Sequence, residues 1–413
     1  MIKDIHPRTP VTSVRRDFST PELRRAFPLE LVATLVGMSP SFVRTVLNHR
    51  EDTVPLRDVL ALLDQDAFAE TFIPRSRIPD WLLQRTSQRV VGKQKSMSLP
   101  DDHCLIQGCA TSLIPRLPAS SVQCVVTSTP YWGTRLYEDA FMVSWADGER
   151  CPFGNEQTPE AFVRHALELL YLLKPVLTPT ASIWWNLMDT YNTRTQIRRN
   201  ASETLRAMRG EDERGWNDHD CRRYSAGHSY LKDGDQCLIP AKVAERASRI
   251  GYHVKSMITW KKDGSMPETV GSRVTRELEY VIHLSVDRTP LFNKGAYLRI
   301  PQGLGGRNRT YESEKLTDVW CFQTSTGRDG HGAQFPIALP GRCIALSTNE
   351  NDLVLDPFVG AGTTVVAARR LERRCIGFDI SDRYLRIAQR RVKGLSTDLP
   401  REAVELPLLE GLP

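Results

Sequence analysis

The sequence predicts an α/β fold, in which a mostly parallel sheet is covered by helices on both faces and is preceded by a small helical region. From about residue 101 onward, apolar runs of strand length alternate with helical stretches, which is the pattern of parallel strands joined by helices. Two of the apolar runs end in polar tips that contain proline or glycine, near residues 128 and 356. Ligands bind beyond the carboxyl ends of such strands, so these two tips are the candidate binding loops.

The bulk properties of the chain narrow the class of protein. At 413 residues, the chain is long enough for a full core and an accessory domain. No stretch approaches the roughly 18 apolar residues of a membrane-spanning helix, so we expect a cytoplasmic protein without membrane contact. The net charge of +6 is compatible with a polyanion partner but is common in other proteins. The nine cysteines form no CxxC pair, which favours reduced thiols and no metal site.

Residues 1–70 are predicted to form a helical domain. A first apolar helix ends at Gly37, Ser39 can cap a second helix, and Pro55 opens a third. Two helices joined by a short glycine turn resemble the helix-turn-helix of DNA-binding proteins, although any small three-helix domain has the same pattern. If the domain contacts DNA, the exposed reading residues would be Ser41, Arg44 and Asn48.

The remaining boundaries follow from composition. Residues 71–100 contain prolines, a glycine and a Lys/Ser run, and are predicted to be a linker. Residues 101–393 are predicted to form the α/β domain, and residues 394–413 a C-terminal tail. The insertion at residues 190–235 carries eight arginines among acids and few apolar residues. It is either a solvated insertion or an arginine-bearing arm over DNA, because guanidinium groups pair with phosphates and guanine edges.

The elements of the α/β domain are predicted from the apolar runs and the helical stretches between them. Strands are expected at residues 105–106, 122–126, 182–187, 254–260, 280–284, 353–355 and 375–378. Helices are expected at residues 160–174, 240–250, 336–348 and 363–373.

One candidate binding loop follows the apolar run that ends at Asp356. Gly360 and Gly362 allow a tight turn and let a ligand approach the backbone closely. Asp379 ends the next predicted strand, 23 residues later (379 − 356), where its carboxylate could accept both hydroxyls of a ribose. The loop lacks the basic residue of a phosphate-binding loop, and Asp356 would repel a pyrophosphate but attract an ammonium group. These features favour S-adenosylmethionine over a dinucleotide. The next helix would begin with Thr363 and Thr364.

The second candidate loop follows the apolar run at residues 122–126. Pro130 stiffens the turn, and Tyr131 can stack on a base that is taken out of a duplex. A polar tip of this kind could also orient an exocyclic amino group for methyl transfer, because such a group needs acceptors for its hydrogens. The Ser128 hydroxyl and the Thr129 carbonyl could supply these acceptors.

In this order, the two loops resemble those of the permuted (β-class) S-adenosylmethionine-dependent DNA amino-methyltransferases of restriction-modification systems. The string Asp-Pro-Phe-x-Gly-x-Gly-Thr-Thr at residues 356–364 is similar to the family's first motif, in which the phenylalanine, here Phe358, flanks the cofactor. The resemblance covers residues 101–393 and implies a circularly permuted, Rossmann-like methyltransferase domain. A segment before the cofactor loop is similar to the family's HPTQKP-type segment, which helps to hold the methionine part of the cofactor, at His331, Gln334 and Pro336.

The resemblance also implies a substrate. The family's catalytic tetrad is Asp/Asn/Ser-Pro-Pro-Tyr/Phe, and a serine in its first position resembles the cytosine-N4 enzymes, whereas aspartate is usual in the adenine-N6 enzymes. This chain departs from the family at Thr129, which replaces a proline, and at Cys109, where an aspartate is common. The implied reaction is methylation of the N4 amino group of a flipped cytosine in double-stranded DNA, in a system that also contains a restriction endonuclease or another defence partner.

Three alternatives remain open. The first is the same reaction on the N6 amino group of adenine. The second is a catalytically silent DNA-binding regulator that retains the fold as a scaffold. The third is a methyltransferase that acts on RNA or on a small molecule. The oligomeric state does not follow from the sequence.

Overall fold

A computed structural model of the chain describes residues 17–65, 67–88, 96–133, 141–156, 158–192, 195–197, 222–224, 231–232, 234–262, 271–322 and 335–394. Its helices include α1 (Thr20–Arg24), α2 (Leu29–Val36), α3 (Pro40–Leu47), α4 (Leu56–Leu63), α5 (Ile78–Gln88), α6 (Ala110–Leu113), α7 (Pro159–Leu173), α9 (Ile239–Arg249), α10 (Ala296–Arg299), α11 (Ala338–Ser347), α12 (Thr363–Arg370) and α13 (Asp382–Lys393). Its strands include β1 (Ala26–Pro28), β2 (Thr53–Pro55), β3 (His103–Gln107), β4 (Val122–Ser128), β5 (Val143–Ser144), β6 (Arg150–Cys151), β7 (Leu177–Leu187), β8 (Thr195–Ile197), β9 (Arg222–Tyr224), β10 (His253–Lys262), β11 (Leu278–Ser285), β12 (Val319–Phe322), β13 (Leu353–Asp356) and β14 (Arg374–Asp379).

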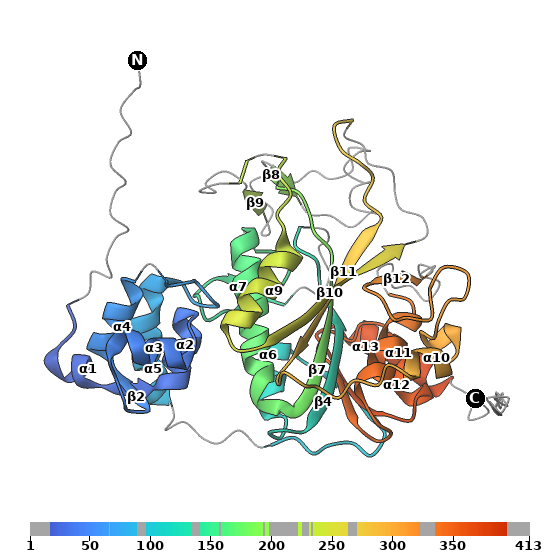
Figure 1. The fold of residues 1–413 in the computed structure, drawn as a ribbon, viewed down its shortest axis with the longest axis horizontal. Helices are drawn as coiled ribbons and strands as arrows, with labels where there is room; N and C mark the ends of the chain where they lie inside the picture. The colour runs from blue at the N-terminus through green and yellow to red at the C-terminus, as the bar shows by residue number, and fades with distance from the viewer. Residues whose placement is uncertain are drawn as a thin grey trace, which may run out of the picture.

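An eight-stranded sheet forms the centre of the α/β domain (Figure 1). Its order is β12-β10-β11-β7-β4-β13-β14-β3. β11 runs antiparallel to both of its neighbours, and the other strand pairs of this sheet are parallel. Helices α7 and α9 lie on one side of the sheet, and α11 and α12 lie on the other (Figure 1). The predicted α/β fold with a mostly parallel sheet is therefore confirmed.

Every strand and helix predicted for this domain is present, within a few residues of its expected bounds. The apolar runs succeed as predictors because central parallel strands are buried on both faces; β4, for example, is buried from Val122 to Thr127. The edge strand β12 was not predicted, since it has only four residues and a partly exposed pattern.

The two candidate binding loops lie at neighbouring strands. β4 pairs with β13 in parallel, through Cys124 opposite Val354 and Val125 opposite Leu355. We call residues 128–133, which follow β4, the catalytic tip, and residues 356–362, which follow β13, the cofactor loop. Because β4 comes first in the chain and its neighbour β13 comes near the end, the order of the two loops is the permuted order that the sequence predicts.

The helical N-terminal region forms a compact module, which comprises the described residues from 17 to 88 and is blue in Figure 1. α2 ends at Gly37 with a left-handed φ of 67°, and the Ser39 hydroxyl accepts a hydrogen bond from the Phe42 amide at the start of α3. The two helices meet at a bend of 97°, within the range of a helix-turn-helix. Ser41 and Asn48 are exposed, whereas the Arg44 guanidinium is bound to Asp52 and to two backbone carbonyls of the same loop.

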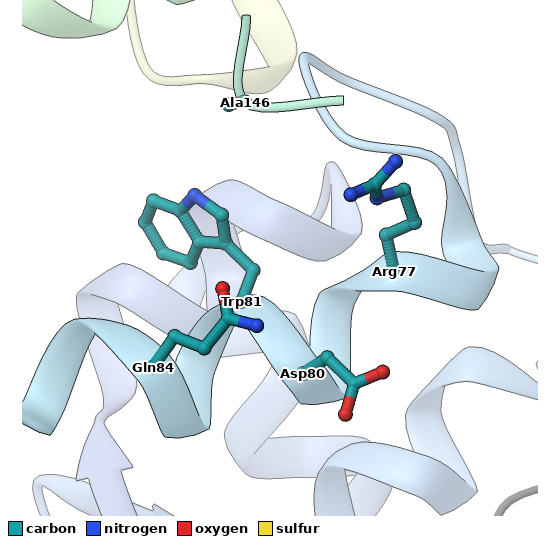
Figure 2. Close-up of a pocket in the computed structure, with 5 residues that line it drawn as sticks. All are labelled: Arg77, Asp80, Trp81, Gln84 and Ala146. Carbon is teal, nitrogen blue, oxygen red and sulfur yellow. The ribbon is translucent and has the colours of Figure 1, made fainter. Parts of the chain in front are cut away.

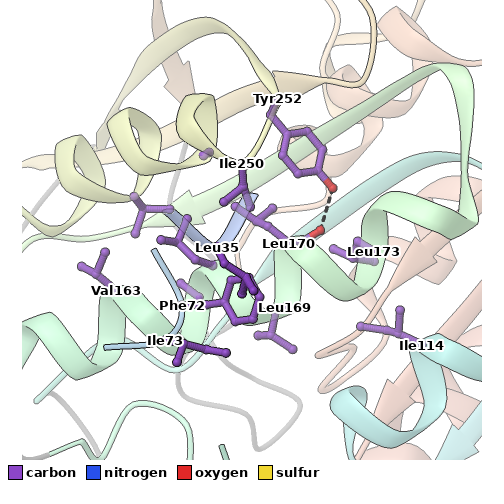
Figure 3. Packing of buried hydrophobic residues seen from close by; sticks show 14 of the residues in the cluster. Leu35, Phe72, Ile73, Ile114, Val163, Leu169, Leu170, Leu173, Ile250 and Tyr252 are labelled. Carbon is purple, nitrogen blue, oxygen red and sulfur yellow. Dashed lines mark hydrogen bonds between the residues drawn. The ribbon is translucent and has the colours of Figure 1, made fainter. Parts of the chain in front are cut away.

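The structure corrects the prediction that residues 71–100 form a linker. This segment contains the helix α5, and its first residues pack into the core of the α/β domain. Figure 3 shows Phe72 and Ile73 beside Leu169 on α7. The Phe72 ring stacks on Tyr171 with centroids 4.7 Å apart, and Tyr171 accepts a hydrogen bond from Arg85 on α5. Proline and lysine content alone could not reveal this, because the packing partners lie about one hundred residues further along the chain.

Some predictions fall largely outside the described residues. Of the insertion at residues 190–235, the structure describes the short antiparallel pair β8–β9 and the segments that flank the insertion. Residues 395–413 also lie outside the described part. Among the described helices, no single one is long and apolar enough to cross a membrane; α2 and α3 together reach that length and composition, but only as a bent pair.

Candidate active site

The cofactor loop and the catalytic tip are joined by a direct hydrogen bond. Thr127, the residue before Ser128, donates its hydroxyl to Asp356 Oδ1 over 2.8 Å, although the two residues are 229 positions apart. Asp356 also accepts hydrogen bonds from the Thr364 hydroxyl and from the Phe358 amide. Its side chain is buried among these donors. Burial raises the pKa of Asp356 to about 6, although the hydrogen bonds that it accepts favour its ionised form.

The cofactor loop is closed by Asp379 at the end of β14. One oxygen of this carboxylate accepts from the Gly360 amide at 2.8 Å, and the other accepts from the Ser381 amide at 2.9 Å. Gly360 and Gly362 both have positive φ, 48° and 82°, which favours glycine. These contacts place the loop and the second acidic residue together, as the 23-residue spacing predicts.

Gly362 has a second reason to be glycine. A Cβ at this position would lie 2.7 Å from the Cβ of Ala388 on α13. The absence of a side chain at Gly362 therefore lets α13 pack closely against the loop. Thr363, which begins α12, is also held by α13, because Arg391 donates to its hydroxyl and to the Ala361 carbonyl.

The acceptor groups and the apolar side chains at this edge of the sheet fit S-adenosylmethionine. Asp379 accepts backbone amides through both of its oxygens, and a carboxylate is the kind of acceptor that ribose hydroxyls require. Phe358 is half-buried at the same edge, with its ring 5.6 Å from that of Phe153, and offers an apolar face. Pro336 is half-buried just before α11. The other two predicted contacts with the methionine part, His331 and Gln334, lie outside the described residues.

The catalytic tip is held by a cluster of polar side chains from three strands. The Tyr131 hydroxyl donates to Glu279 Oε2 on β11 at 2.5 Å and lies 3.2 Å from the Ser128 hydroxyl. Asn186 on β7 donates to both the Tyr131 hydroxyl and Glu279 Oε2, each at 2.7 Å. Lys262 on β10 forms an ion pair with Glu279 Oε1 at 2.9 Å. Glu279 thereby fixes the orientation of the Tyr131 hydroxyl.

Glu279 and Lys262 were not predicted as site residues. Glu279 is a buried acid near the start of a mostly apolar strand, and an acid in such a strand is a signal in the sequence that could have identified it. Asn186 Oδ1 is buried without a hydrogen-bond partner among the described residues, so an acceptor is left over beside Ser128.

The departure at Thr129 has a structural counterpart. Its side chain is buried, and its hydroxyl accepts a hydrogen bond from Trp185 Nε1 at 3.1 Å. This bond ties the catalytic tip to β7 at the position where the family has a rigid proline ring. Cys109, the other departure, is the N-cap residue of α6 next to the end of β3, and its sulfur lies 3.1 Å from the Thr111 hydroxyl.

Comparison with known proteins gives consistent matches. A family model described as DNA methylase matches residues 122–390. The chain is 31% identical over 304 residues to the Type II methyltransferase M.Cfr9I of Citrobacter freundii, which covers 72% of this chain and 90% of that protein. It is 30% identical over 299 residues to the Type II methyltransferase M.XycI of Xanthomonas campestris pv. cyanopsidis, with the same coverage. Among solved structures, a PvuII DNA methyltransferase (cytosine-N4-specific) aligns with 75% of this chain and 91% of its own, at 18% identity and a TM-score of 0.49.

Proposed function

This chain belongs to the DNA methylase family, and we propose that it methylates the N4 amino group of cytosine in double-stranded DNA. It is a DNA methyltransferase that uses S-adenosylmethionine as its methyl donor. The family includes enzymes that act on adenine as well as on cytosine, so the target base is part of the proposal.

The observation that carries the proposal is the position of Ser128. It is the last residue of β4, one residue beyond the threonine that binds Asp356, and its hydroxyl lies beside Tyr131 and Asn186. A serine hydroxyl is a neutral acceptor and donor, unlike the carboxylate that is usual in the adenine-N6 enzymes. Serine in this position therefore favours cytosine as the target.

The residues of the catalytic tip would have different roles in binding the base. The Ser128 hydroxyl and the Thr129 carbonyl would accept the two amino hydrogens, which turns the nitrogen lone pair away from the ring. Tyr131 would stack on the flipped base, with its hydroxyl fixed by Glu279. When bound, S-adenosylmethionine supplies an electrophilic methyl group on sulfonium. The hydrogen bond between Thr127 and Asp356 fixes the positions of the two loops relative to each other, and so of the amino group relative to the methyl group.

The cofactor would be held by the loop after β13 and by the strand that follows it. Asp379 would bind the ribose hydroxyls, and Phe358 would flank the cofactor. Asp356 would act mainly by ordering the loop and by placing negative charge near the methionine ammonium, because its oxygens are occupied by the chain's own donors. The complete proposed set also includes Gly360, Gly362, Thr363, Thr364, His331, Gln334 and Pro336.

The relatives named above are Type II methyltransferases, which supports a role in a restriction-modification system with a companion endonuclease. The helix-turn-helix geometry of α2 and α3 supports a DNA contact by the N-terminal module. Ser41 and Asn48 are the exposed candidates there.

The test is methyl transfer from labelled S-adenosylmethionine to unmethylated genomic DNA, followed by hydrolysis of the DNA and separation of its nucleosides. We expect label in N4-methyldeoxycytidine. Label in N6-methyldeoxyadenosine alone would overturn the assignment of the base. No transfer to DNA, together with binding to a specific site, would instead support the silent regulator.

A matched pair of variants ties the activity to Ser128. Ser128→Ala is expected to lower kcat by at least about tenfold, the effect of losing one well-placed hydrogen bond in the transition state. Ser121→Ala is the control, because Ser121 precedes the other end of β4 and its hydroxyl binds only the Pro118 carbonyl among the contacts described. Equal activity of the two variants would contradict the role of Ser128.

A further inference from the structure

A buried cluster of charged side chains lies behind the catalytic tip. His165 on α7 is completely buried, with Nδ1 3.0 Å from Glu156 Oε1 and Nε2 3.2 Å from Asp147 Oδ2. Both carboxylates are buried as well. The Trp145 ring lies parallel to the imidazole, with centroids 4.1 Å apart. A protonated imidazole between two carboxylates satisfies this arrangement, because each ring nitrogen can then donate to an acid.

One end of the cluster supports the catalytic tip. Glu156 Oε1 also accepts the Gly154 amide, and the Glu156 carbonyl accepts Trp132 Nε1 at 2.9 Å. Gly154 in turn accepts the Gly133 amide at 3.2 Å. Gly154 packs so closely on the tip that a Cβ there would lie 2.8 Å from the Cβ of Pro130. Residues 154–156 are therefore the surface on which the catalytic tip rests.

The other end reaches the N-terminal module. Asp147 Oδ2 accepts a hydrogen bond from Arg164 Nε at 2.9 Å, and Arg164 Nη1 lies 3.4 Å from Glu70 Oε2 of the module. Glu70 immediately precedes the segment with Phe72 that packs against α7 (Figure 3).

The module also contacts the hairpin β5–β6 directly, and the turn of this hairpin carries Asp147. A Cβ at Gly148 would overlap the guanidinium of Arg77, so this arginine lies directly on the hairpin turn. Figure 2 shows Arg77 and Trp81 facing the hairpin at Ala146, around a small cavity of about 240 Å³. The module is thus linked to the hairpin that carries Asp147 in two ways, directly at Arg77 and through Arg164 on α7.

We propose that the series of ion pairs from Glu70 to Glu156 positions the catalytic tip, so that the N-terminal module is a structural part of the active site. This inference rests on the proposed function, and it names positioning residues for that reaction. Thr129 removes one proline ring from the tip, which raises the need for support from outside. A displacement of about 1 Å at a reacting group can cost on the order of a hundredfold in rate.

The test uses the full chain and three single substitutions. His165→Gln removes the imidazolium within the cluster, and Glu70→Gln removes the charge at the module end. Glu160→Gln is the matched control, since Glu160 lies on the same helix as His165 and forms a half-buried ion pair with Lys242, which is not part of the series. We expect His165→Gln to lower kcat by at least about tenfold and Glu70→Gln by about twofold to threefold, with the Kd for S-adenosylmethionine and for DNA changed by less than about twofold. Glu160→Gln should leave all three unchanged.

Hydrogen–deuterium exchange supplies a readout that does not depend on activity. In both His165→Gln and Glu70→Gln, the amides of residues 129–133 and 150–156 should exchange faster than in the wild type. The amides of β13 and β14 should keep their protection. This measurement separates failure of the inference from failure of the proposed function.

Three results would overturn the proposal. One is unchanged exchange at the catalytic tip in the Glu70 variant, which removes only a partly exposed charge and should fold even if the His165 variant does not. Another is an equal loss of kcat in the Glu160 control. The third is a bound metal ion in the purified protein that depends on His165, Cys151 and Glu149, whose ligand atoms lie within 4.8 Å of one another, because a metal-bound Nε2 cannot carry the proton that pairs with Asp147.

Discussion

At the scale of single residues, the two loops of the site use their polar groups differently. The hydroxyls of the catalytic tip are shared with side chains of neighbouring strands, above all Glu279 and Asn186. Asp356 instead accepts hydrogen bonds from its own loop, from α12 and from Thr127. A substitution in the catalytic tip should therefore affect the orientation of the base. A substitution of Asp356 should affect the loop that holds the cofactor.

Two substitutions test this division. Tyr131→Ala should lower kcat by about a hundredfold and leave the Kd for S-adenosylmethionine within about twofold, because the ring contacts the base. Asp356→Asn should raise that Kd by about tenfold, because an amide cannot accept from all three donors. Calorimetric titration and single-turnover methyl transfer measure the two effects. Tyr131→Phe is the control that removes only the hydroxyl bound to Glu279. Similar effects of Tyr131→Ala and Asp356→Asn on both quantities would contradict the division.

The buried imidazole of His165 makes stability depend on pH. Burial alone would lower the pKa of His165, but its hydrogen bonds to Asp147 and Glu156 outweigh burial and raise the pKa to about 9. The pKa of a histidine side chain in the unfolded protein is about 6.5. The stabilisation from the protonated ring is therefore complete below about pH 6.5 and is lost as the pH rises through about 9.

We expect the free energy of unfolding in urea to fall between pH 7 and pH 9.5 by more in the wild type than in His165→Gln, by an amount of up to about 3 kcal/mol. Glu168, on the same helix, also titrates in this range, since burial raises its pKa to about 7. Glu168 is present in both proteins, but the charge on His165 lowers its pKa, so the difference between the two proteins reports the loss of His165 together with its effect on Glu168. Equal slopes in the two proteins would show that the ring is neutral in the folded state.

At the scale of elements, the cofactor loop depends on the helix that packs behind it. The positive φ of Gly362 and its contact with Ala388 on α13 both exclude a side chain. Gly362→Ala should therefore destabilise the fold by about 2 kcal/mol, through backbone strain and overpacking. Gly303→Ala is the control, because a Cβ there would have no atom within 4 Å other than those of the chain next to it. Thermal unfolding compares the two; an equal change in Tm would mean that α13 moves aside without cost.

The catalytic tip likewise depends on neighbouring strands. Trp185 and Asn186 on β7 bind Thr129 and Tyr131, because β4 and β7 pair in parallel with Ser128 opposite Asn186. The pairing register thus decides which residue of β7 faces the tip. A shift by one residue would turn Asn186 to the other face of the sheet.

At the scale of the whole molecule, the N-terminal module and the α/β domain share one hydrophobic core. Phe72 stacks on Tyr171, and Arg85 of α5 binds the same tyrosine. The boundary predicted at residue 70 therefore falls inside a packed interface. The module sits beside the hairpin that supports the catalytic tip, which is why removing it would affect the site and not only a DNA contact.

The sequence by itself determined the α/β fold, the strands and helices of the sheet, the order of the two loops and the identity of the cofactor. These follow from local signals: apolar runs mark buried strands, and the strings at residues 128–131 and 356–364 mark strand ends. Tertiary structure decided the rest. Glu279 is 148 positions from Tyr131, and Glu70 is 94 positions from Arg164. Such pairs meet because strands and helices pack side by side, and no local pattern records which side chains that packing buries together.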